Sequence, residues 1–278
     1  MNPILVEELL KTYLNEDIGR ADLTAEGVYR GEIVHARIVA KEDGILAGLP
    51  FAVRVFRLLG GELNVISAIR EGSPFKKGDI LLELEGNAKT LLMGERVALN
   101  ILQRLSGIAT KTRRMVEKIK DLPVKLLDTR KTTPGFRLFE KYAVKVGGGE
   151  NHRFALYDMV MIKDNHIKVA GGVEEAVRRV RQLISPVYKI EVEVSTFEEL
   201  LKVLTLPVDI VMLDNFSVED AKEAVSIVRQ ERPDIMVEIS GGINEENIRA
   251  YAESGCDFIS SGSIIHSARW LDLSMKFV

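Results

Sequence analysis

The sequence has few of the features that mark secreted, membrane or nucleic-acid-binding proteins. It contains a single cysteine, Cys256, so no internal disulfide can form, and a reducing compartment such as the cytoplasm fits best. No stretch approaches the ~20 apolar residues of a membrane-spanning helix, and the N-terminal segment lacks the basic start and apolar centre of a signal peptide. The 38 basic and 41 acidic residues give a net charge of −3, which predicts no binding to nucleic acid or to an anionic membrane. Any anion site must therefore come from a local concentration of positive side chains.

The first part of the chain combines helical and strand-like patterns. Residues 1–23 are predicted to form a short amphipathic helix and a turn, and Asp22 and Thr24 are plausible capping residues. Residues 31–86 alternate between apolar and polar positions in the manner of strands, with one helical stretch among them. Residues 88–120 have the spacing of a long helix, in which Gly107 is a candidate kink.

The rhythm changes after residue 123, where short apolar runs alternate with helical segments. The runs are 124–128, 160–163, 188–194, 209–214, 235–240 and 257–262, and the helices between them are expected near 172–184, 196–205, 217–230 and 244–254. Continuous apolar strands separated by helices indicate a parallel sheet covered on both faces. Six such units favour an incomplete (β/α) barrel over an open doubly wound sheet, and no G-x-G-x-x-G follows a strand.

Positive side chains gather after the first two runs of this barrel. The active site of a βα barrel lies at the carboxyl ends of its strands. The cations expected to point together into that site are Arg130, His152, Arg153 and Lys163. Several converging cations repel one another unless an anion joins them, so they predict a small polyanionic ligand. Lys141 and Lys145, by contrast, are expected on a solvated helix face.

Acidic side chains follow on the next two strands. In YKIEVEV, Glu191 and Glu193 share one face, which should be the barrel interior, and Asp214 ends the neighbouring strand beside Glu193. The two neighbouring carboxylates at the rim, Glu193 and Asp214, could hold Mg²⁺, bind sugar hydroxyls or stabilise a developing positive charge. The alternative is that they are ion-pair partners of Lys163 and Lys131.

Two glycine-rich loops follow the last two strands. One contains Ser240, Gly241 and Gly242, and the other contains Ser261, Gly262 and Ser263. In barrels of this type the corresponding loops and a helix N-terminus form a phosphate site. The pair of loops therefore predicts a phosphate cradle.

Together these segments resemble the quinolinate phosphoribosyltransferase family over nearly the whole chain and in order. The segments that carry the resemblance are ERVALNILQRLSGIAT (95–110), DTRKTTPGFRLFEKYAVKVGGGENHR (128–153), MIKDNH (161–166), EVEV (191–194), MLDN (212–215), ISGGI (239–243) and SSGSIIHS (260–267). Two departures are small: Ala155 stands where glycine is expected, and Ser261 where valine is expected.

The resemblance implies an α/β fold with two domains. An N-terminal α/β sandwich, assigned to residues 1–110, precedes an open-faced α/β (TIM-like) barrel at 111–278, whose last residues are expected to pack back on the first domain. It also implies a homodimer in which the partner chain completes each site, with assembly into hexamers left open. The helical end of the first domain is expected at the dimer interface.

The resemblance also implies roles for individual residues. Arg130, His152, Arg153 and Lys163 correspond to quinolinate-binding cations, and Arg96 corresponds to an arginine supplied across the dimer interface. Lys131, Glu193 and Asp214 correspond to residues around the ribose, pyrophosphate and Mg²⁺ of phosphoribosyl pyrophosphate (PRPP). The phosphate cradle corresponds to Ser240, Gly241, Gly242 and Gly262. Lys131, Lys163, Glu193 and Asp214 are the expected catalytic residues.

The implied reaction is that of a pentosyltransferase of NAD biosynthesis. Quinolinate and PRPP give nicotinate mononucleotide, pyrophosphate and CO₂, with Mg²⁺ as cofactor. Three alternatives stay open: a paralogue of the same fold with another anionic ligand, such as the molybdenum-associated relatives; a barrel lyase that forms a Schiff base through Lys163; and a non-enzymatic sensor of nucleotides or carboxylates.

Overall fold

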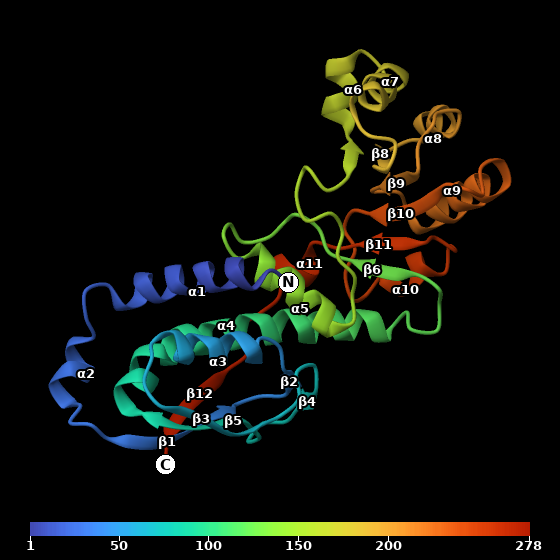
Figure 1. Cartoon of the computed structure of the whole chain (residues 1–278). Helices are drawn as coiled ribbons and strands as arrows, with labels where there is room; N and C mark the ends of the chain where they lie inside the picture. The colour runs from blue at the N-terminus through green and yellow to red at the C-terminus, as the bar shows by residue number, and fades with distance from the viewer. The chain divides into compact units, whose positions relative to one another are not determined.

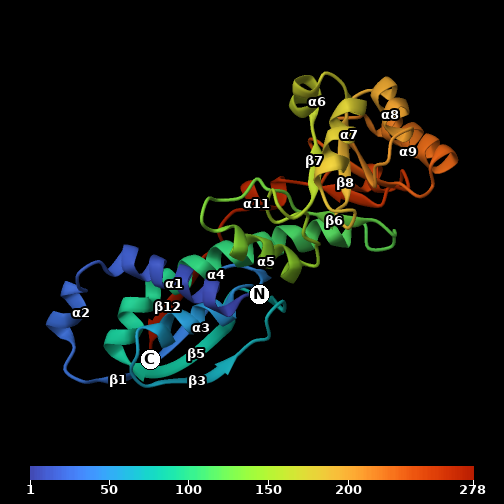
Figure 2. The ribbon, with the colours of Figure 1, turned by 45° about the horizontal axis from the view of Figure 1, so that its top comes forward.

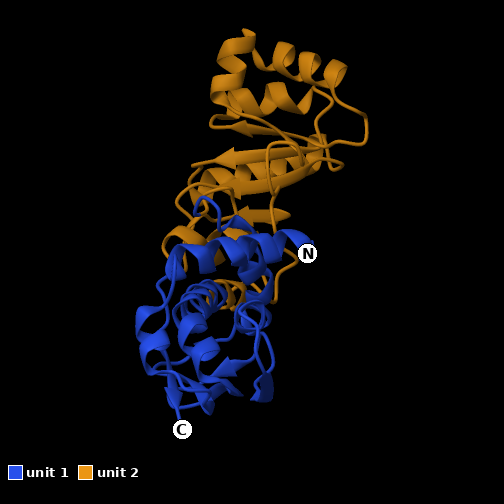
Figure 3. Cartoon of the chain, turned by 60° about the vertical axis from the view of Figure 1, so that its left-hand side comes forward, with its two compact units in different colours: residues 1–111, 133–147, 268–278 blue, residues 112–132, 148–267 orange.

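The computed structural model describes all 278 residues, and its internal contacts divide the chain into two compact units. Unit 1 contains residues 1–111, 133–147 and 268–278, and unit 2 contains residues 112–132 and 148–267 (Figure 3). The boundary expected after residue 110 lies beside the end of the first segment of unit 1. No helix is long and apolar enough to cross a membrane.

Unit 1 is built around a four-stranded antiparallel sheet. Its strands are β1 (Ile33–Ala40), β3 (Leu63–Ala68), β5 (Ile80–Asn87) and β12 (Leu273–Phe277), in the order β12-β1-β5-β3. Buried and less buried residues alternate along β1 and β5, so one face of the sheet packs on the core. The sequence indicated that the chain end packs back here, but not that it forms a strand. A separate two-stranded sheet contains β2 (Gly44–Ile45) and β4 (Pro74–Phe75).

Helices cover one face of this sheet (Figure 1). The two helices over the sheet are α3 (Leu49–Leu58) and α4 (Ala88–Glu117). The remaining helices of unit 1 are α1 (Pro3–Ile18), α2 (Leu23–Val28) and α5 (Arg137–Gly147). Asp22 caps α2 as predicted, because its carboxylate accepts hydrogen bonds from the backbone N–H groups of Thr24 at 3.1 Å and Ala25 at 2.9 Å.

Residues 133–147 pack with unit 1 through a buried ion pair that the sequence did not indicate. The guanidinium of Arg104 on α4 lies 2.6 Å from Oε1 of Glu140 on α5, and the Glu140 side chain is fully buried. Glu140 Oε2 also accepts a hydrogen bond from the Thr133 N–H at 2.8 Å. The rings of Phe51 and Phe139, 4.9 Å apart, add an apolar contact. These contacts attach α5 to the first unit.

The expectation that Lys141 lies on a solvated face of its helix is wrong. Phe139, Glu140 and Lys141 are all buried, and Lys141 is only 1% exposed, whereas Lys145 is exposed as expected. Three consecutive residues cannot all lie on one narrow stripe of a helix, so α5 is enclosed on more than one side. The helical spacing alone did not reveal this.

Gly107 has a different role from the predicted kink. Helix α4 is continuous across it, and a Cβ atom at this position would lie 1.9 Å from the carbonyl oxygen of Arg269. The glycine is required because the C-terminal segment of unit 1 crosses the helix in direct contact.

We therefore expect Gly107→Ala to lower the free energy of unfolding by about 2–3 kcal/mol, because the backbone at Arg269 has to move. Gly27→Ala is the matched control, since Gly27 lies in α2 with nothing within 4 Å of its added Cβ atom. That change should be neutral or stabilising by up to ~1 kcal/mol. Urea unfolding of both variants tests the pair, and equal effects would contradict the steric explanation.

Unit 2 contains a six-stranded, wholly parallel sheet. Its strands are β6 (Lys125–Leu127), β7 (Val160–Ile162), β8 (Ile190–Val194), β9 (Ile210–Asp214), β10 (Met236–Ser240) and β11 (Phe258–Ser260), in the order β6-β11-β10-β9-β8-β7. The first and last strands of this series, β6 and β7, are the two edges, so the barrel is open. The predicted fold class is confirmed.

The helices of unit 2 follow the strands in order (Figure 2). Four were predicted: α7 (Val173–Leu183), α8 (Phe197–Leu204), α9 (Val218–Glu231) and α10 (Ile248–Ala252). Two short helices were not predicted from the sequence. They are α6 (Asp164–Ala170), which follows β7, and α11 (Ser263–His266), which follows β11. Both begin where polar clusters end a strand, and so they belong to the candidate site.

Candidate active site

A cavity of about 350 Å³ opens at the carboxyl ends of the unit 2 strands. Its lining is Thr129, Arg130, Lys131, His152, Arg153, Met161, Lys163, Glu193, Met212, Asp214, Glu238, Ser240 and Ser260. The structure thus brings together nine of the residues predicted from sequence: Arg130, Lys131, His152, Arg153, Lys163, Glu193, Asp214 and Ser240 around the cavity, and Glu191 in contact with His152.

Strand register explains why these side chains meet. Met212 on β9 is paired with Glu193 on β8 and with Glu238 on β10, so the three lie in one row across the sheet. Residues paired in this way point to the same face of a sheet. Two positions further on, Asp214 is paired with Ser240 and forms a second row nearer the strand ends.

Lys163 and Glu193 form an ion pair inside the cavity. Lys163 directly follows β7, and its backbone N–H donates to Nδ1 of His166 at 3.0 Å, which fixes the start of α6. Of the two ion pairs that the alternative interpretation required, the structure contains this one. A ligand that engages either group must therefore compete with, or join, an existing pair.

The segment that carries His152 and Arg153 is fixed by its backbone. The buried carboxylate of Asp128 accepts a hydrogen bond from the His152 N–H at 2.9 Å. The Arg153 guanidinium donates to the carbonyl oxygen of Met159 at 2.9 Å. Burial and the neighbouring Arg130 both lower the pKa of Arg153. Two guanidinium groups that line one cavity favour binding of an anion between them.

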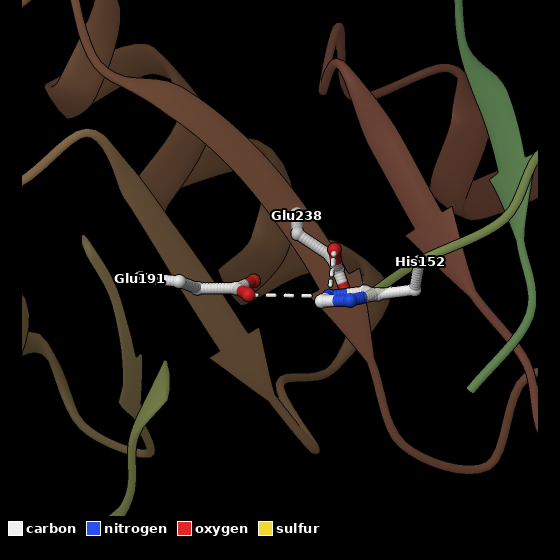
Figure 4. A group of neighbouring side chains, drawn as sticks. All are labelled: His152, Glu191 and Glu238. Atoms are coloured by element: carbon white, nitrogen blue, oxygen red, sulfur yellow. Dashed lines mark ion pairs between the residues drawn. The ribbon is translucent and has the colours of Figure 1, made fainter. Parts of the chain in front are cut away.

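The His152 ring lies between two buried carboxylates (Figure 4). Its Nε2 is 3.1 Å from Glu191 on β8 and 3.3 Å from Glu238 on β10, and the three side chains are at most 7% exposed. Glu191 and Glu193 both point inward as predicted, but they have different partners. Glu238 was missed, although it is the one charged residue in the apolar run IMVEIS and shares the face of Ser240.

The protonation state of this cluster follows from its charges. Burial alone would lower the pKa of His152, but its contacts with Glu191 and Glu238 raise that pKa to about 10. Burial and the charge of Glu238 raise the pKa of Glu191. The Arg153 N–H lies 2.6 Å from Nδ1 of His152, which favours a neutral ring. Because two carboxylate charges in a buried site outweigh one peptide dipole, we assign the charged ring. The Nε2 proton is present in either state.

The loop after β10 combines unusual backbone conformations with a close approach. Gly241 and Gly242 have φ of 98° and 63°, and Asn215 has φ of 58°, all in the region that favours glycine. A Cβ atom on Gly241 would lie 2.3 Å from Oδ1 of Asn215. Asn215 also donates from its amide to Asp214 Oδ2 at 2.7 Å. The loop is therefore shaped by glycine and packed against the end of β9.

The loop after β11 is tied to this one by serine hydroxyls. The Ser261 hydroxyl is buried, donates to the carbonyl oxygen of Ile243 at 2.7 Å and lies 2.7 Å from the Ser263 hydroxyl. A direct contact of the Ser261 side chain with a phosphate would break these bonds. A Cβ atom on Gly262 would meet Lys131 at 3.0 Å and His266 at 3.1 Å, so this glycine allows those two side chains to approach.

Arg96 is exposed on α4 in unit 1 and does not line the cavity of its own chain. Its role across a dimer interface stays a prediction. The sequence analysis also missed Ser260, a buried residue of the cavity wall whose hydroxyl has no hydrogen-bond partner. A serine at the start of SSGS gave no signal that set it apart from its neighbours.

Comparison with known proteins identifies relatives over the whole chain. The family model described as "Quinolinate phosphoribosyl transferase, N-terminal domain" matches residues 22–106, and the corresponding C-terminal domain matches residues 108–276. A "probable nicotinate-nucleotide pyrophosphorylase (carboxylating)" from Synechocystis sp. is 45% identical over 99% of this chain and 93% of its own length. The protein of the same name from Bacillus subtilis is 42% identical over 99% and 94%.

Solved structures agree with these matches. The nicotinate-nucleotide pyrophosphorylase from Francisella tularensis is 40% identical and superposes with a TM-score of 0.93 over 100% of this chain and 98% of its own. A second structure, from Streptococcus pyogenes, is 41% identical, with a TM-score of 0.92 over 99% and 98%.

Proposed function

Because the chain belongs to the quinolinate phosphoribosyltransferase family, we propose that it transfers the phosphoribosyl group of PRPP to quinolinate with loss of CO₂. The products are nicotinate mononucleotide and pyrophosphate, so the enzyme is a pentosyltransferase of NAD biosynthesis. The observation that carries the proposal is the cavity at the strand ends, which is lined by four cations of the predicted quinolinate set and by three carboxylates, Glu193, Asp214 and Glu238.

The cations match the charge of the acceptor. Quinolinate carries two carboxylates, and the guanidinium groups of Arg130 and Arg153 offer planar forks that suit such groups. Lys163 and His152 supply further positive charge at the same cavity. A mononegative ring acid such as nicotinate would leave part of this charge uncompensated, so the cavity favours the dicarboxylate.

The negatively charged side chains of the cavity suit the phosphoribosyl donor, PRPP. As pyrophosphate leaves PRPP, positive charge develops on the ribose, and the carboxylates of Glu193 and Asp214 can stabilise it. Lys131 can neutralise the leaving pyrophosphate. The glycine loops at Gly241 and Gly262, whose backbones approach their neighbours closely, are proposed to bind the 5-phosphate.

The residues present also fit Mg²⁺. This ion prefers oxygen ligands, often one or two carboxylates together with substrate phosphates. Glu193 and Asp214 line the same cavity, and they would hold the ion directly or through PRPP. When bound, it would neutralise the pyrophosphate.

Decarboxylation follows from the pyridinium that the transfer creates. The electron pair left on the ring carbon when CO₂ departs is stabilised by the adjacent positively charged nitrogen, and a proton then takes the place of CO₂ on that carbon. Orientation and desolvation of the carboxylate are therefore the main requirements. The competing Schiff-base interpretation needs Lys163 as a free amine nucleophile. That residue is held in an ion pair with Glu193, which makes the interpretation less favourable.

We further propose a homodimer in which Arg96 of the partner subunit completes each site, and a cytoplasmic location. Arg96 suits this role because it is exposed on α4. The single cysteine, Cys256, is buried and free, as expected in a reducing compartment.

The first experiment combines the purified protein with quinolinate, PRPP and Mg²⁺ and follows nicotinate mononucleotide by chromatography. We expect product from quinolinate, none from nicotinate in a parallel reaction, and loss of product when Mg²⁺ is replaced by a chelator. Absence of product from folded protein would assign the cavity to another anionic ligand, as in a paralogue.

A further inference from the structure

We propose that Glu191 and Glu238 are positioning residues for quinolinate, which act by holding the Nε2–H of His152 between them. The inference rests on the proposed function, in which His152 belongs to the acceptor subsite. Neither carboxylate is part of the cation set or of the donor-binding set described above.

The geometry of the cluster supports this role. The two carboxylates come from β8 and β10, which lie on either side of β9, so they approach the ring from different directions. Their distances to Nε2 are 3.1 and 3.3 Å, so both carboxylates lie within ion-pair distance of the same ring nitrogen (Figure 4). A ring held from two strands cannot rotate without losing one of these contacts.

The backbone supplies the remaining constraint. Asp128 accepts a hydrogen bond from the backbone N–H of His152 at 2.9 Å. The main chain at His152 is therefore fixed, and His152 and Glu238 both line the cavity.

Burial makes a purely structural role a poor explanation. Glu191 and Glu238 are 0% and 1% exposed, and a pair of like charges in a barrel interior costs stability unless it serves a purpose. Three of their four carboxylate oxygens form no hydrogen bond of good geometry within the chain. A methionine or leucine at either position would fill the interior at lower cost.

Two variants at position 238 distinguish the presence of an acceptor oxygen near His152 from the presence of a negative charge. Glu238→Met removes the acceptor, and we expect the KM for quinolinate to rise by about 10- to 100-fold. Glu238→Gln keeps an oxygen at the same reach and should stay within about threefold of wild type. The KM for PRPP should change by less than about twofold in both, because the donor groups are untouched.

A double variant tests whether Glu238 acts through His152. In a His152→Gln background, Glu238→Met should add less than about twofold to the KM for quinolinate, because the contact is already lost. If the double variant instead raises the KM for quinolinate by the product of the two single effects, the proposal is overturned. If Glu238→Met does not fold, Glu238→Asp replaces it, since the shorter side chain keeps the charge but withdraws the acceptor, and an unchanged KM for quinolinate would again overturn it.

Glu71→Met is the matched control, because it also removes a carboxylate that accepts hydrogen bonds within the fold, but at a position outside the cavity. Glu71 lies in unit 1, where it accepts hydrogen bonds from the N–H groups of Gly48 and Leu49 at the start of α3. This variant should lose stability without a change in either KM. Failure of the wild-type protein to turn over quinolinate would reject the proposed function, whereas normal turnover with an unchanged KM in Glu238→Met would reject only this inference.

Discussion

We expect replacement of Lys163 with alanine to lower kcat/KM for quinolinate by about 10³-fold or more, because a charge that faces the reacting groups is lost from a partly buried site. The amine lines the cavity and pairs with Glu193, so its removal leaves that carboxylate without its cation. The loss should affect kcat as well as KM, since the same amine meets both the acceptor and the carboxylate proposed to stabilise the ribose.

The fold should survive this change. Lys163 is 42% exposed, and ion pairs at such positions contribute about 1 kcal/mol or less to stability. Lys168→Ala is the matched control, because Lys168 on α6 is 73% exposed, pairs with Asp164 and does not line the cavity. It should keep nearly full activity. A Lys163→Ala enzyme with near-wild-type kcat/KM would remove Lys163 from the site, and Arg130→Ala can be judged in the same assay.

Mixing two inactive variants restores activity if the site is shared between subunits. Chains with Arg96→Ala and chains with Lys163→Ala are each expected to be inactive as homodimers. Random pairing of equal amounts makes half of the dimers hybrid, and one of the two sites in each hybrid is intact. About a quarter of the wild-type activity should therefore return after dissociation and reassembly.

A second mixture controls for effects of reassembly. Arg130 and Lys163 line the same cavity of one chain. In hybrids of Arg130→Ala and Lys163→Ala chains, each of the two sites therefore lacks one of these side chains, and the hybrids should stay inactive. If the Arg96 mixture also stays inactive, with hybrid dimers demonstrated by native mass spectrometry, then Arg96 does not act across the interface.

Much of unit 2 could be predicted because its pattern is local. Each of its six apolar runs forms a strand, and the polar residues that follow lie at one edge because parallel strands end together. Lys163, Glu193 and Asp214 were found in this way. The alternation of Glu191 and Glu193 predicted their common face without any knowledge of their partners.

The features that were missed depend on contacts between distant segments. Lys141 and Lys145 look alike in sequence, but only Lys145 is exposed. Glu238 is the one charged residue of its strand, and its proposed role depends on His152, which lies 86 positions earlier in the sequence. In the structure Nε2 of His152 is 3.3 Å from the Glu238 carboxylate. Helical or strand periodicity indicates which side of an element faces inward, but not which residue of another segment it contacts there.

Strand β12 has a consequence for synthesis of the chain on the ribosome. The sheet of unit 1 pairs β1 with Leu273–Phe277, so one of its edge strands is translated last, after the whole of unit 2. Until then the nascent chain exposes the free edge of β1, which is open to pairing with other chains. Unit 2 has all of its strands before residue 267 and can fold first. The barrel that carries the chemistry is thus complete before the unit that encloses the N-terminus.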